Sequence, residues 1–337
     1  MVPALAVADA LRAEGAEVEF VGADRAEARL VPGAGYPLHT LTLRGLDRSN
    51  PLRALYALAL AALAIPRARA LLRRLAPDAV MGAGGYVAGP VALAALSMRI
   101  PLVLTEADSH LGLTNRLLAP FARRVCLAFP LAGREGSRYR VTGRPIPPPS
   151  DDRARARERF AIEPLETCVL VFGGSLGARS INLAAVEGLA DAAFHVLHVC
   201  GARDHPQLLA RITRAGYDLR EYLDLDAFAD ALGAADLVVA RSGGSVFEIA
   251  AHGLPAILVP YPHASADHQS ANARWMAQAG AALTIPDAEL NAGRLRAEVD
   301  ALLSDRDRLA AMARAAAELA RPQAAQDVAQ ELLEAAA

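Results

Sequence analysis

Short runs of apolar residues alternate along this chain with longer stretches in which apolar residues recur at helical spacing. In the first half the apolar runs are Val18–Gly22, Ala79–Gly85, Pro101–Glu106 and Val125–Phe129. In the second half they are Cys168–Gly174, Phe194–Gly201, Leu237–Ala240 and Ala256–Pro262. Such runs are typical of buried strands, and the stretches between them predict helices. Strands that alternate with helices predict an α/β fold with a doubly wound parallel sheet, here twice.

A proline-rich joint divides the chain into two halves. The sequence GRPIPPPSDD covers residues 143–152. We therefore predict an N-terminal domain over residues 1–146, a C-terminal domain over 147–318, and a helix over 319–337 that packs back on the N-terminal domain. A length of 337 residues is sufficient for two α/β domains. Two such domains on a hinge predict a ligand cleft between them.

The chain begins unusually, with a predicted helix over Pro3–Gly15 that leads into the run at Val18. A doubly wound domain normally starts with a strand and a phosphate-binding loop. The first strand and its loop are therefore expected to be missing from this sequence, which would leave backbone groups of the sheet unpaired. We expect roughly 10–20 further residues upstream, enough for one strand and a loop.

Charge is distributed unevenly along the chain. Residues 1–150 hold 18 arginines against 11 acidic residues, a balance of +7, whereas residues 151–337 carry −9. This asymmetry suggests that the first half faces an anionic partner such as a membrane or a phosphate, although solvated helix faces explain it equally well. The segment Arg44–Leu75 joins a leucine- and alanine-rich helix to seven arginines. It is typical of a segment resting on anionic lipid, or of a buried helix with an arginine rim.

The three cysteines, Cys126, Cys168 and Cys200, lie far apart and form no CxxC pair. This pattern indicates a reduced, cytosolic protein without a disulfide framework or a zinc site. No signal peptide is recognised. The longest apolar stretch, Leu55–Ile65, is too short to span a bilayer, which needs about 20 residues.

Two glycine-rich turns follow predicted strands. In GGSLGA, residues 173–178, backbone amides and the Ser175 hydroxyl are suited to holding a diphosphate; the alternative is a tight turn that binds nothing. The dinucleotide pattern GxGxxG is absent. In GAGGYVAGP, residues 82–90, Gly84 and Gly85 would let a second anion approach a helix start, or would serve close packing of helix on sheet.

The stretch of residues 241–273 predicts a glycine turn, a short helix, a strand and a second helix. Ser245 precedes Glu248 by three residues, the spacing of a capping box. The Glu248 carboxylate is suited to both hydroxyls of a ribose, or it only caps the helix; the two roles are compatible. Gln269 and Asn272 share one face of the second helix and suit the hydroxyls of a sugar, unless they form only an exposed helix start.

Polar residues also follow the run Pro101–Glu106. Glu106, Asp108 and His110 at the end of a strand are candidate acid–base groups, with a polar loop that caps the next helix through Thr114 as the alternative. The histidines at positions 252, 263 and 268 match no metal-ligand spacing, so no metal site is predicted.

Several of these motifs together resemble the MurG family of bacterial glycosyltransferases. GGYVAGP, TEADSHLGLTN, GRP, GGSLGAR, RSGGSVFEIAAHGLPAILVPYP and DHQSANA stand in the order found in that family and cover nearly the whole chain. The resemblance implies the GT-B fold, two Rossmann-like domains that face a cleft. It also implies a C-terminal domain that holds the UDP-sugar and a basic N-terminal domain that holds the lipid acceptor.

The resemblance also assigns roles to individual residues. Ser175 and the backbone at Gly174 would bind the donor diphosphate, and the Leu223 backbone would meet the uracil. The residues that would follow the nucleotide to its ribose are Gly244, Ser245, Val246, Phe247 and Glu248. Gln269 and Asn272 would read the N-acetylglucosamine hydroxyls. The acceptor-side diphosphate loop would contain Gly84, Gly85, Tyr86 and Gly89.

The sequence departs from the family pattern at three places. The family's GGTxGH-type loop, whose histidine is a candidate base, would stand just before Val2 and is absent. Asp108 occupies a position where many members have Asn, and Glu106, Asp108 and His110 are the local candidates for the base. Pro147 stands where an arginine often contacts the donor, and Arg144 is the nearest replacement.

The implied reaction is an inverting, metal-independent transfer of N-acetylglucosamine from UDP-GlcNAc to undecaprenyl-diphospho-MurNAc-pentapeptide, which converts lipid I into lipid II. No cofactor and no nucleic acid are implied. The implied partners are an anionic membrane surface and a cell-wall synthesis or division complex, with the protein peripheral on the cytoplasmic face of the plasma membrane. The alternatives are a GT-B transferase with another acceptor, a UDP-GlcNAc 2-epimerase-like enzyme, and an inactive UDP-sugar-binding homologue that lacks the N-terminal loop.

Overall fold

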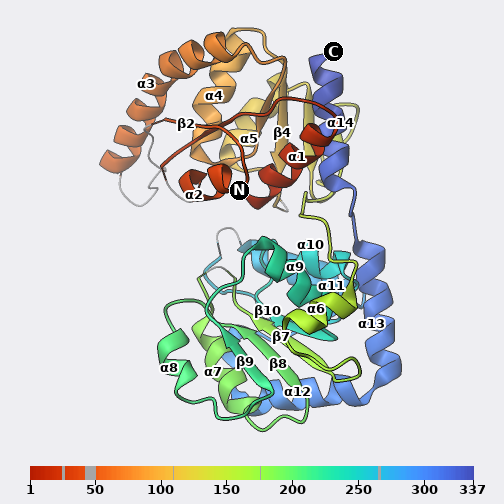
Figure 1. The fold of residues 1–337 in the computed structure, drawn as a ribbon. Helices are drawn as coiled ribbons and strands as arrows, with labels where there is room; N and C mark the ends of the chain where they lie inside the picture. The colour runs from red at the N-terminus through yellow and green to blue at the C-terminus, as the bar shows by residue number, and fades with distance from the viewer. Residues whose placement is uncertain (25–26, 42–50, 109, 175, 265–266) are drawn as a thin grey trace. The chain divides into compact units, whose positions relative to one another are not determined.

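The computed structural model describes residues 1–24, 27–41, 51–108, 110–174, 176–264 and 267–337. It divides into two compact units (Figure 1). Unit 1 comprises Met1–Ile146 together with Gln323–Ala337, and unit 2 comprises Pro147–Pro322. The chain therefore leaves unit 1 at the proline-rich joint and returns to it with its last helix.

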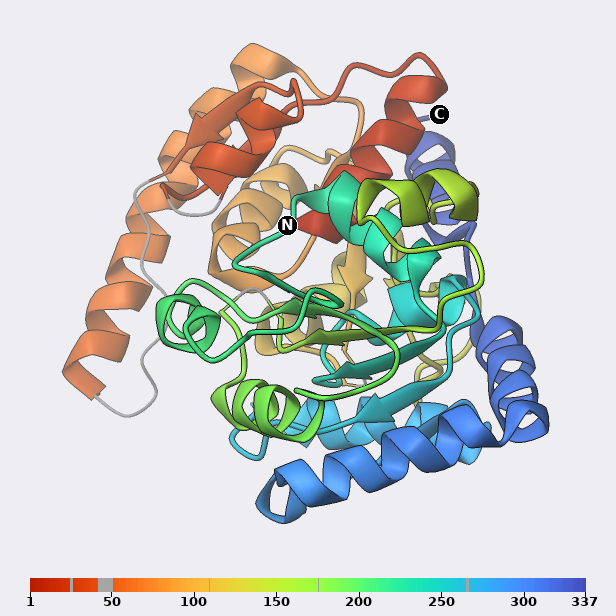
Figure 2. The ribbon, with the colours of Figure 1, turned by 60° about the horizontal axis from the view of Figure 1, so that its bottom comes forward.

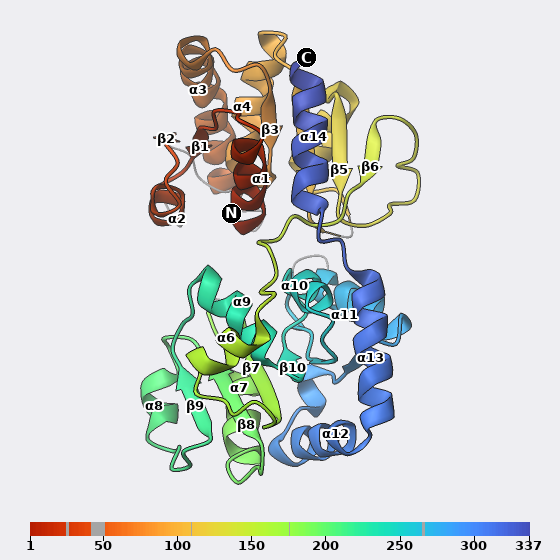
Figure 3. The same ribbon diagram turned by 45° about the vertical axis from the view of Figure 1, so that its right-hand side comes forward.

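Unit 1 contains short parallel strands and the helices that cover them. Its elements are α1 (Val2–Ala13), β1 (Phe20–Gly22), α2 (Glu27–Gly33), β2 (Leu38–Thr40), α3 (Pro51–Leu75), β3 (Val80–Gly82), α4 (Gly85–Ser97), β4 (Leu102–Glu106), α5 (Leu113–Leu118), the 3-10 turn η1 (Ala119–Phe121), β5 (Arg124–Leu127), β6 (Tyr139–Val141) and α14 (Ala324–Ala336). The last helix lies beside α1 and against β4 and β5 (Figure 3).

The strands of unit 1 form two separate parallel sheets rather than one. Strands β1 and β2 pair only with each other, and the second sheet has the order β3-β4-β5-β6. Among the described residues no strand joins β1 to β3, and a cavity of about 900 Å³ is lined by both. Strands β1 and β3 are thus separated by this cavity, and the expectation of a missing first strand stays a prediction.

Helix α3 shows how the basic segment of the sequence folds over its described part. Ala64, Ala68 and Leu72 recur every four residues and are buried in one cluster with α4 residues. The exposed side of the same helix carries Arg67 and Arg73. This half of α3 is thus a packed helix with an arginine rim, while residues 42–50 of the segment lie outside the described ranges.

Unit 2 is a single six-stranded parallel sheet with helices on both faces. Its elements are α6 (Arg153–Arg159), β7 (Cys168–Phe172), α7 (Arg179–Gly188), β8 (His195–Val199), α8 (His205–Leu209), β9 (Tyr217–Arg220), α9 (Leu225–Ala234), β10 (Leu237–Ala240), α10 (Val246–Ala251), β11 (Ala256–Leu258), α11 (His268–Gln278), β12 (Ala282–Thr284), the 3-10 turn η3 (Asp287–Glu289), α12 (Ala292–Ser304) and α13 (Arg306–Leu319). Figure 2 gives a second view of these strands, coloured green to blue.

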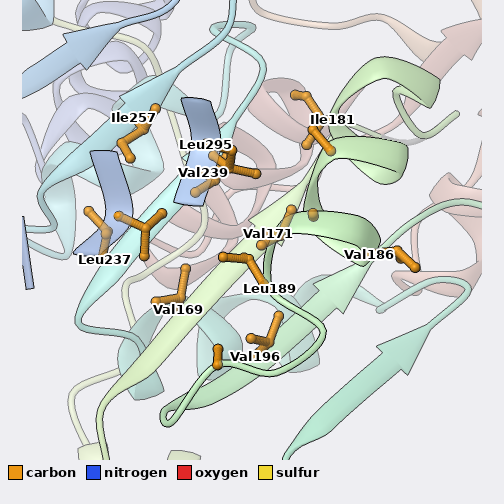
Figure 4. Close-up of a cluster of buried hydrophobic side chains, with 14 of the residues drawn as sticks. Val169, Val171, Ile181, Val186, Leu189, Val196, Leu237, Val239, Ile257 and Leu295 are labelled. Carbon is orange, nitrogen blue, oxygen red and sulfur yellow. The ribbon is translucent and has the colours of Figure 1, made fainter. Parts of the chain in front are cut away.

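The core of unit 2 follows from strands that are apolar on both faces. Val169, Val171 and Val239 point to one face and pack with Ile181 of α7 and Leu295 of α12 (Figure 4). On the opposite face the ring of Phe172 meets that of Phe228 in α9 at 5.0 Å. Central strands of a doubly wound sheet need apolar residues at every position, which explains why they appear in the sequence as unbroken runs.

No helix within the described ranges has both the length and the apolar character needed to cross a bilayer.

Candidate functional site

The strand order of unit 2 creates a topological switch point. The order is β12-β11-β10-β7-β8-β9, so the chain winds outward from β7 in one direction and from β10 in the other. All neighbouring strands are parallel, and their carboxyl ends lie at the same edge. In open α/β sheets, ligands bind where the winding direction reverses. The turns that follow β7 and β10, which carry most of the predicted donor-site residues, lie at this point.

The turn after β7 is shaped by glycines that no larger residue can replace. A Cβ atom at Gly173 would lie 2.3 Å from the Ala178 nitrogen, and one at Gly177 would lie 2.0 Å from the Cys200 carbonyl oxygen. Gly174 has a φ of +87° and faces open space. The turn therefore packs closely against the loop after β8 and leads directly into α7. Ser175, its predicted hydroxyl donor, lies outside the described residues.

A buried chain of hydrogen bonds fixes the loop against which this turn packs. The Tyr217 hydroxyl lies 2.9 Å from His198 Nδ1, and His198 Nε2 lies 3.1 Å from Asn182 Oδ1. The Asn182 amide nitrogen donates to the Cys200 carbonyl and to the Asp204 carboxylate. Because that amide donates both protons, its oxygen must accept, which assigns the proton of neutral His198 to Nε2. The network joins two strands, α7 and the loop after β8.

Burial lowers the pKa of His198 from its usual value to about 3, so the folded protein holds this imidazole neutral. The unfolded chain protonates His198 at about pH 6.5 and below, whereas unit 2 does not. Stability should therefore fall as the pH drops below 6.5, by about 1.4 kcal/mol per pH unit from this group. Burial also lowers the pKa values of His195 and His252, so these two groups also make the folded protein less stable at low pH.

We expect the free energy of unfolding, measured with urea, to be about 2 kcal/mol lower at pH 5 than at pH 8 because of His198. The fluorescence of Trp275, the single tryptophan, reports unit 2 alone, since it lies in α11. The variant His198→Gln should be less stable than wild type at pH 8, but its free energy of unfolding should fall less on acidification. Equal pH slopes for the two proteins would contradict the assignment, because His195 and His252 remain in both.

Arg241, directly after β10, ties together three other segments at the same edge. Its guanidinium donates to the Val259 and Pro260 carbonyls, to Asp287 Oδ1 at 2.6 Å and to the Ser180 hydroxyl at 2.9 Å. These partners lie after β11, in η3 and in the first turn of α7. The side chain is only 10% exposed. A buried guanidinium with this many acceptors holds the two turns of the switch point in one arrangement.

The turn after β10 differs from expectation at its helix start. Ser245 stands at the N-cap of α10 but makes no side-chain capping hydrogen bond, so the predicted capping box is wrong. Its backbone is already helical, with φ −63° and ψ −12°, which orients the hydroxyl unfavourably for capping. Val246 is fully buried, and Phe247 packs on Trp275 with ring centroids 5.1 Å apart. Gly244 and Glu248 are half-buried.

The two amides of α11 are placed differently from each other. Asn272 is 4% exposed and donates to the carbonyls of Ser242 and Gly243, so it supports the turn from beneath. Gln269 is half-buried, and its side-chain oxygen accepts from the Tyr261 amide. The Gln269 carbonyl in turn accepts from the Ser242 hydroxyl. Both residues therefore help to shape the turn after β10.

Leu223 lies beyond the carboxyl end of β9, the edge strand of the sheet. It is half-buried, between the exposed Tyr222 and Asp224, whose carboxylate caps α9 through the Ala227 amide. In the strand order β9 is two strands away from β7. Leu223 therefore belongs to the same carboxyl edge, at a distance from the two central turns.

In unit 1 the three candidate acid–base residues have different surroundings. Glu106 ends β4, is 8% exposed, and accepts from the backbone amides of Asp108 and Gly112 and from the Asn115 amide. These three hydrogen bonds tie the loop after β4 to the Glu106 carboxylate. Asp108 is half-buried and His110 exposed. Thr114 does not cap α5, whose N-cap is Gly112 without a side-chain bond.

The predicted acceptor-side loop begins α4. Gly84 and Gly85 have φ values of +79° and +78°, and a Cβ at either would meet nothing within 4 Å, so the backbone of this turn is open. A Cβ at Gly89 would lie 3.6 Å from the Thr114 methyl group, which identifies Gly89 as a contact point between α4 and α5. Of Tyr86 only the backbone is described. Arg144 is half-buried and lines the unit 1 cavity.

Sequence reasoning missed Arg241, Asn182 and Asn115, which are buried and polar at the carboxyl ends of strands or in the helices that follow. Arg241 opens the motif RSGGSVFEIAAHGLPAILVPYP, Asn115 closes TEADSHLGLTN, and Asn182 follows GGSLGAR, but the motifs alone gave none of the three a role. Among the described residues no group of three histidine, cysteine or acidic side chains is arranged to hold a metal ion.

Both halves of the chain match one known family. Residues 1–127 match the glycosyltransferase family 28 N-terminal domain, and residues 168–330 match the glycosyltransferase family 28 C-terminal domain. Two curated relatives are each named UDP-N-acetylglucosamine--N-acetylmuramyl-(pentapeptide) pyrophosphoryl-undecaprenol N-acetylglucosamine transferase. The one from Moorella thermoacetica is 42% identical over 98% of this chain and 94% of its own length. The one from Rubrobacter xylanophilus is 42% identical over 97% and 98%.

The chain is also similar in fold to solved structures. MurG of Acinetobacter baumannii has a TM-score of 0.77 and 31% identity, covering 98% of this chain and 95% of its own. A UDP-GlcNAc 2-epimerase of Neisseria meningitidis, bound to UDP-GlcNAc, has a TM-score of 0.69 at 14% identity, covering 99% and 96%. The second likeness is one of fold alone. The first confirms the predicted GT-B fold of two Rossmann-like domains.

Proposed function

The chain belongs to the MurG family within glycosyltransferase family 28, and on this premise we propose that it converts lipid I into lipid II. In this reaction N-acetylglucosamine passes from UDP-GlcNAc to the 4-hydroxyl of MurNAc in undecaprenyl-diphospho-MurNAc-pentapeptide, with inversion at the anomeric carbon. The reaction belongs to peptidoglycan synthesis. The observation that carries the proposal is the switch point of unit 2, where two glycine turns flank the reversal of a parallel sheet.

In the proposed donor site the diphosphate rests on the turn after β7, with Gly174 and Ser175 as its contacts. The α7 N-terminus supports negative charge there. The turn after β10 follows the nucleotide, from Gly244 to Phe247, and the Glu248 carboxylate accepts the ribose hydroxyls. Leu223 meets the uracil through its backbone. Gln269 and Asn272 serve the sugar, Asn272 by holding the turn that the donor contacts.

The transfer requires stabilisation of the negative charge on the leaving UDP and a base that takes the proton of the acceptor hydroxyl. As the bond to the anomeric carbon breaks, negative charge grows on the UDP diphosphate, and fixed backbone amides meet it without reorganising. This arrangement needs no metal ion. The acceptor hydroxyl loses its proton as it attacks. Glu106 already serves three donors, so Asp108 and His110 are the better local candidates for the base.

The test is transfer of radiolabelled N-acetylglucosamine from UDP-GlcNAc to a short-chain lipid I analogue, together with calorimetric titration of UDP. We expect labelled disaccharide product. We expect Glu248→Gln to weaken UDP binding at least about tenfold, since a charge-assisted hydrogen bond contributes roughly 1.5–3 kcal/mol. The matched control is Glu318→Gln, which removes an exposed carboxylate from helix α13.

Three outcomes would contradict the proposal in whole or in part. If wild type and Glu248→Gln bind UDP with equal affinity, the donor site does not lie at the switch point. UDP-GlcNAc turnover without any acceptor would indicate a 2-epimerase-like reaction on the same fold. Transfer to a diacylglycerol or a small aglycone in place of lipid I would change the acceptor and leave the donor site intact.

For the lipid-facing surface we propose the helix formed by α5 and η1 in unit 1. Leu113, Leu117 and Phe121 recur every four residues and are 41%, 62% and 68% exposed. Arg116 and Arg123 are exposed beside them. An exposed apolar stripe with flanking arginines suits insertion into an anionic membrane surface. We propose a peripheral position on the cytoplasmic face of the plasma membrane, where cell-wall synthesis or division proteins would be neighbours.

Vesicle binding should depend on this stripe. The double variant Leu117→Ser, Phe121→Ser is expected to reduce binding to phosphatidylglycerol vesicles at least tenfold, because two large apolar side chains each contribute roughly 1.5–3 kcal/mol when buried. Sedimentation with vesicles measures the effect. The matched control is Leu165→Ser, which removes a leucine that is 99% exposed in unit 2. Equal losses in both variants, or no loss in the double variant, would assign the membrane contact elsewhere.

A further inference from the structure

The linker that enters unit 2 is fixed to it at Ser150. The three prolines at 147–149 have no amide proton, so Ser150 is the first residue of unit 2 that can donate a backbone hydrogen bond. Its amide donates to His252 Nε2 at 3.1 Å, and its hydroxyl donates to Asp230 Oδ1 at 2.9 Å. Two hydrogen bonds from one residue therefore attach the linker to unit 2.

The Asp230 end of this attachment is buried and ionic. Asp230 lies in α9, is 2% exposed, and accepts from Arg155 Nη2 and Arg159 Nη1 of α6, both at 2.8 Å. Charge-assisted hydrogen bonds of this kind are short and directional, so they hold a buried carboxylate in one position. The Ser150 hydroxyl thus binds to an acceptor that is itself fixed.

The His252 end of the attachment leads to the helix that carries Glu248. His252 directly follows α10, and the Glu248 carbonyl oxygen lies 3.1 Å from its backbone nitrogen and 2.8 Å from its Nδ1. A carbonyl can only accept, so the proton of the neutral imidazole lies on Nδ1, and Nε2 accepts from Ser150. Burial lowers the pKa of His252 and so favours this neutral form. The imidazole therefore bridges the Glu248 carbonyl and the Ser150 amide.

Helix α10 is short enough to depend on contacts at its ends. It spans Val246–Ala251, and a helix of six residues has few internal hydrogen bonds to hold it in shape. Just beyond it, Gly253 has a φ of +62°, and a Cβ there would lie 3.6 Å from the Ala313 carbonyl oxygen of α13. The position of Glu248 is thus set from the C-terminal end of the helix as well as from the glycine turn before it.

We propose that His252 is a positioning residue for the donor: given the proposed contact between the Glu248 carboxylate and the ribose, it couples donor affinity to the attachment of the linker. Such a coupling is reciprocal. A bound nucleoside diphosphate holds α10 and strengthens the bond to Ser150, and a detached linker loosens α10 and weakens nucleotide binding by the same factor. The linker is one of two places where the chain passes between the units, so its freedom then depends on the donor.

Two substitutions separate the two hydrogen bonds of the imidazole. In His252→Gln the longer side chain still brings an acceptor to the Ser150 amide, whereas in His252→Asn the shorter amide reaches only the Glu248 carbonyl. NMR measures amide hydrogen exchange of Ser150 in the whole protein, and calorimetry measures UDP affinity. We expect His252→Asn to exchange Ser150 at least about fivefold faster than wild type and to bind UDP about fivefold more weakly, the change that one neutral hydrogen bond supplies. His252→Gln should stay within about twofold of wild type in both.

Added UDP tests the coupling from the other side. Saturating UDP should slow Ser150 exchange at least about threefold in wild type and leave it unchanged in His252→Asn. Exchange of the Ala227 amide, which is bonded to Asp224 at the start of α9, should be equal in all three proteins and reports that the unit stays folded.

The results distinguish the coupling from the donor site on which it depends. Equal UDP affinity of His252→Asn and His252→Gln would overturn the coupling while the donor site stands. Ser150 exchange that does not respond to UDP in a wild type that binds it would do the same. A wild type that does not bind UDP would overturn the donor site itself, and the coupling with it.

Discussion

Replacing Arg241 with leucine is expected to lower the free energy of unfolding of unit 2 by about 3 kcal/mol, because the half-buried Asp287 carboxylate and three further acceptors lose a charged donor. Asp287 and Ser180 both lose their guanidinium partner, and two carbonyls after β11 lose a donor. UDP affinity should fall with it, since the turn after β10 and the start of α7 are no longer held together.

Urea unfolding followed by Trp275 fluorescence measures the stability, and calorimetry measures UDP binding. The matched control is Arg296→Leu, which removes an arginine paired with the exposed Asp191 and Asp300 in the same unit. Exposed pairs contribute about 0–1 kcal/mol, so this control should change little. If both variants lose the same amount, Arg241 does not have the organising role that its geometry assigns to it.

Gly177→Ala is expected to lower the stability of unit 2 by about 3 kcal/mol and to abolish UDP binding. The added Cβ would lie 2.0 Å from the Cys200 carbonyl oxygen, so backbone must move, and overpacking of this kind costs about 1–3 kcal/mol. The left-handed φ of +73° adds about 1 kcal/mol. The displaced turn is the one proposed to hold the diphosphate.

A second glycine separates the two causes. Gly133 in unit 1 has a φ of +72°, and a Cβ there would meet nothing within 4 Å. Gly133→Ala therefore carries the backbone penalty without the clash and should leave UDP binding unchanged. Thermal unfolding and UDP calorimetry compare the two variants. A Gly177→Ala protein that binds UDP normally would show that this turn does not contact the donor.

The strands that the sequence predicted most clearly are those with helices on both faces. The runs at Cys168–Gly174 and Leu237–Ala240 became β7 and β10 because every position in them is buried. The sequence pattern missed β2, β6, β9 and β12. All four lie at sheet edges and are only partly buried or short. An edge strand needs few apolar residues, so hydrophobicity alone does not reveal it.

For the functional site, too, the sequence revealed features that depend on neighbouring residues and missed those that depend on residues far apart in the chain. Glycines and strand ends identified both turns of the switch point from the sequence. The capping box at Ser245 was wrong because spacing alone does not fix the backbone angles at a helix start. Asn272 was assigned to a sugar, yet its buried amide also holds the carbonyls of a turn some thirty residues earlier in the chain. Spacing along one helix carries no information about such distant partners.

The sequence by itself determined the fold class, the family and the two glycine turns, because these depend on local periodicity and on motifs whose residues are close together in the chain. Only the tertiary structure decided which buried polar side chains hold the turns, because Arg241, Asn182 and Glu106 act through partners from other strands and helices. It also located the gap between β1 and β3. Strand neighbours are set by the winding of the whole sheet, which no short window of residues encodes.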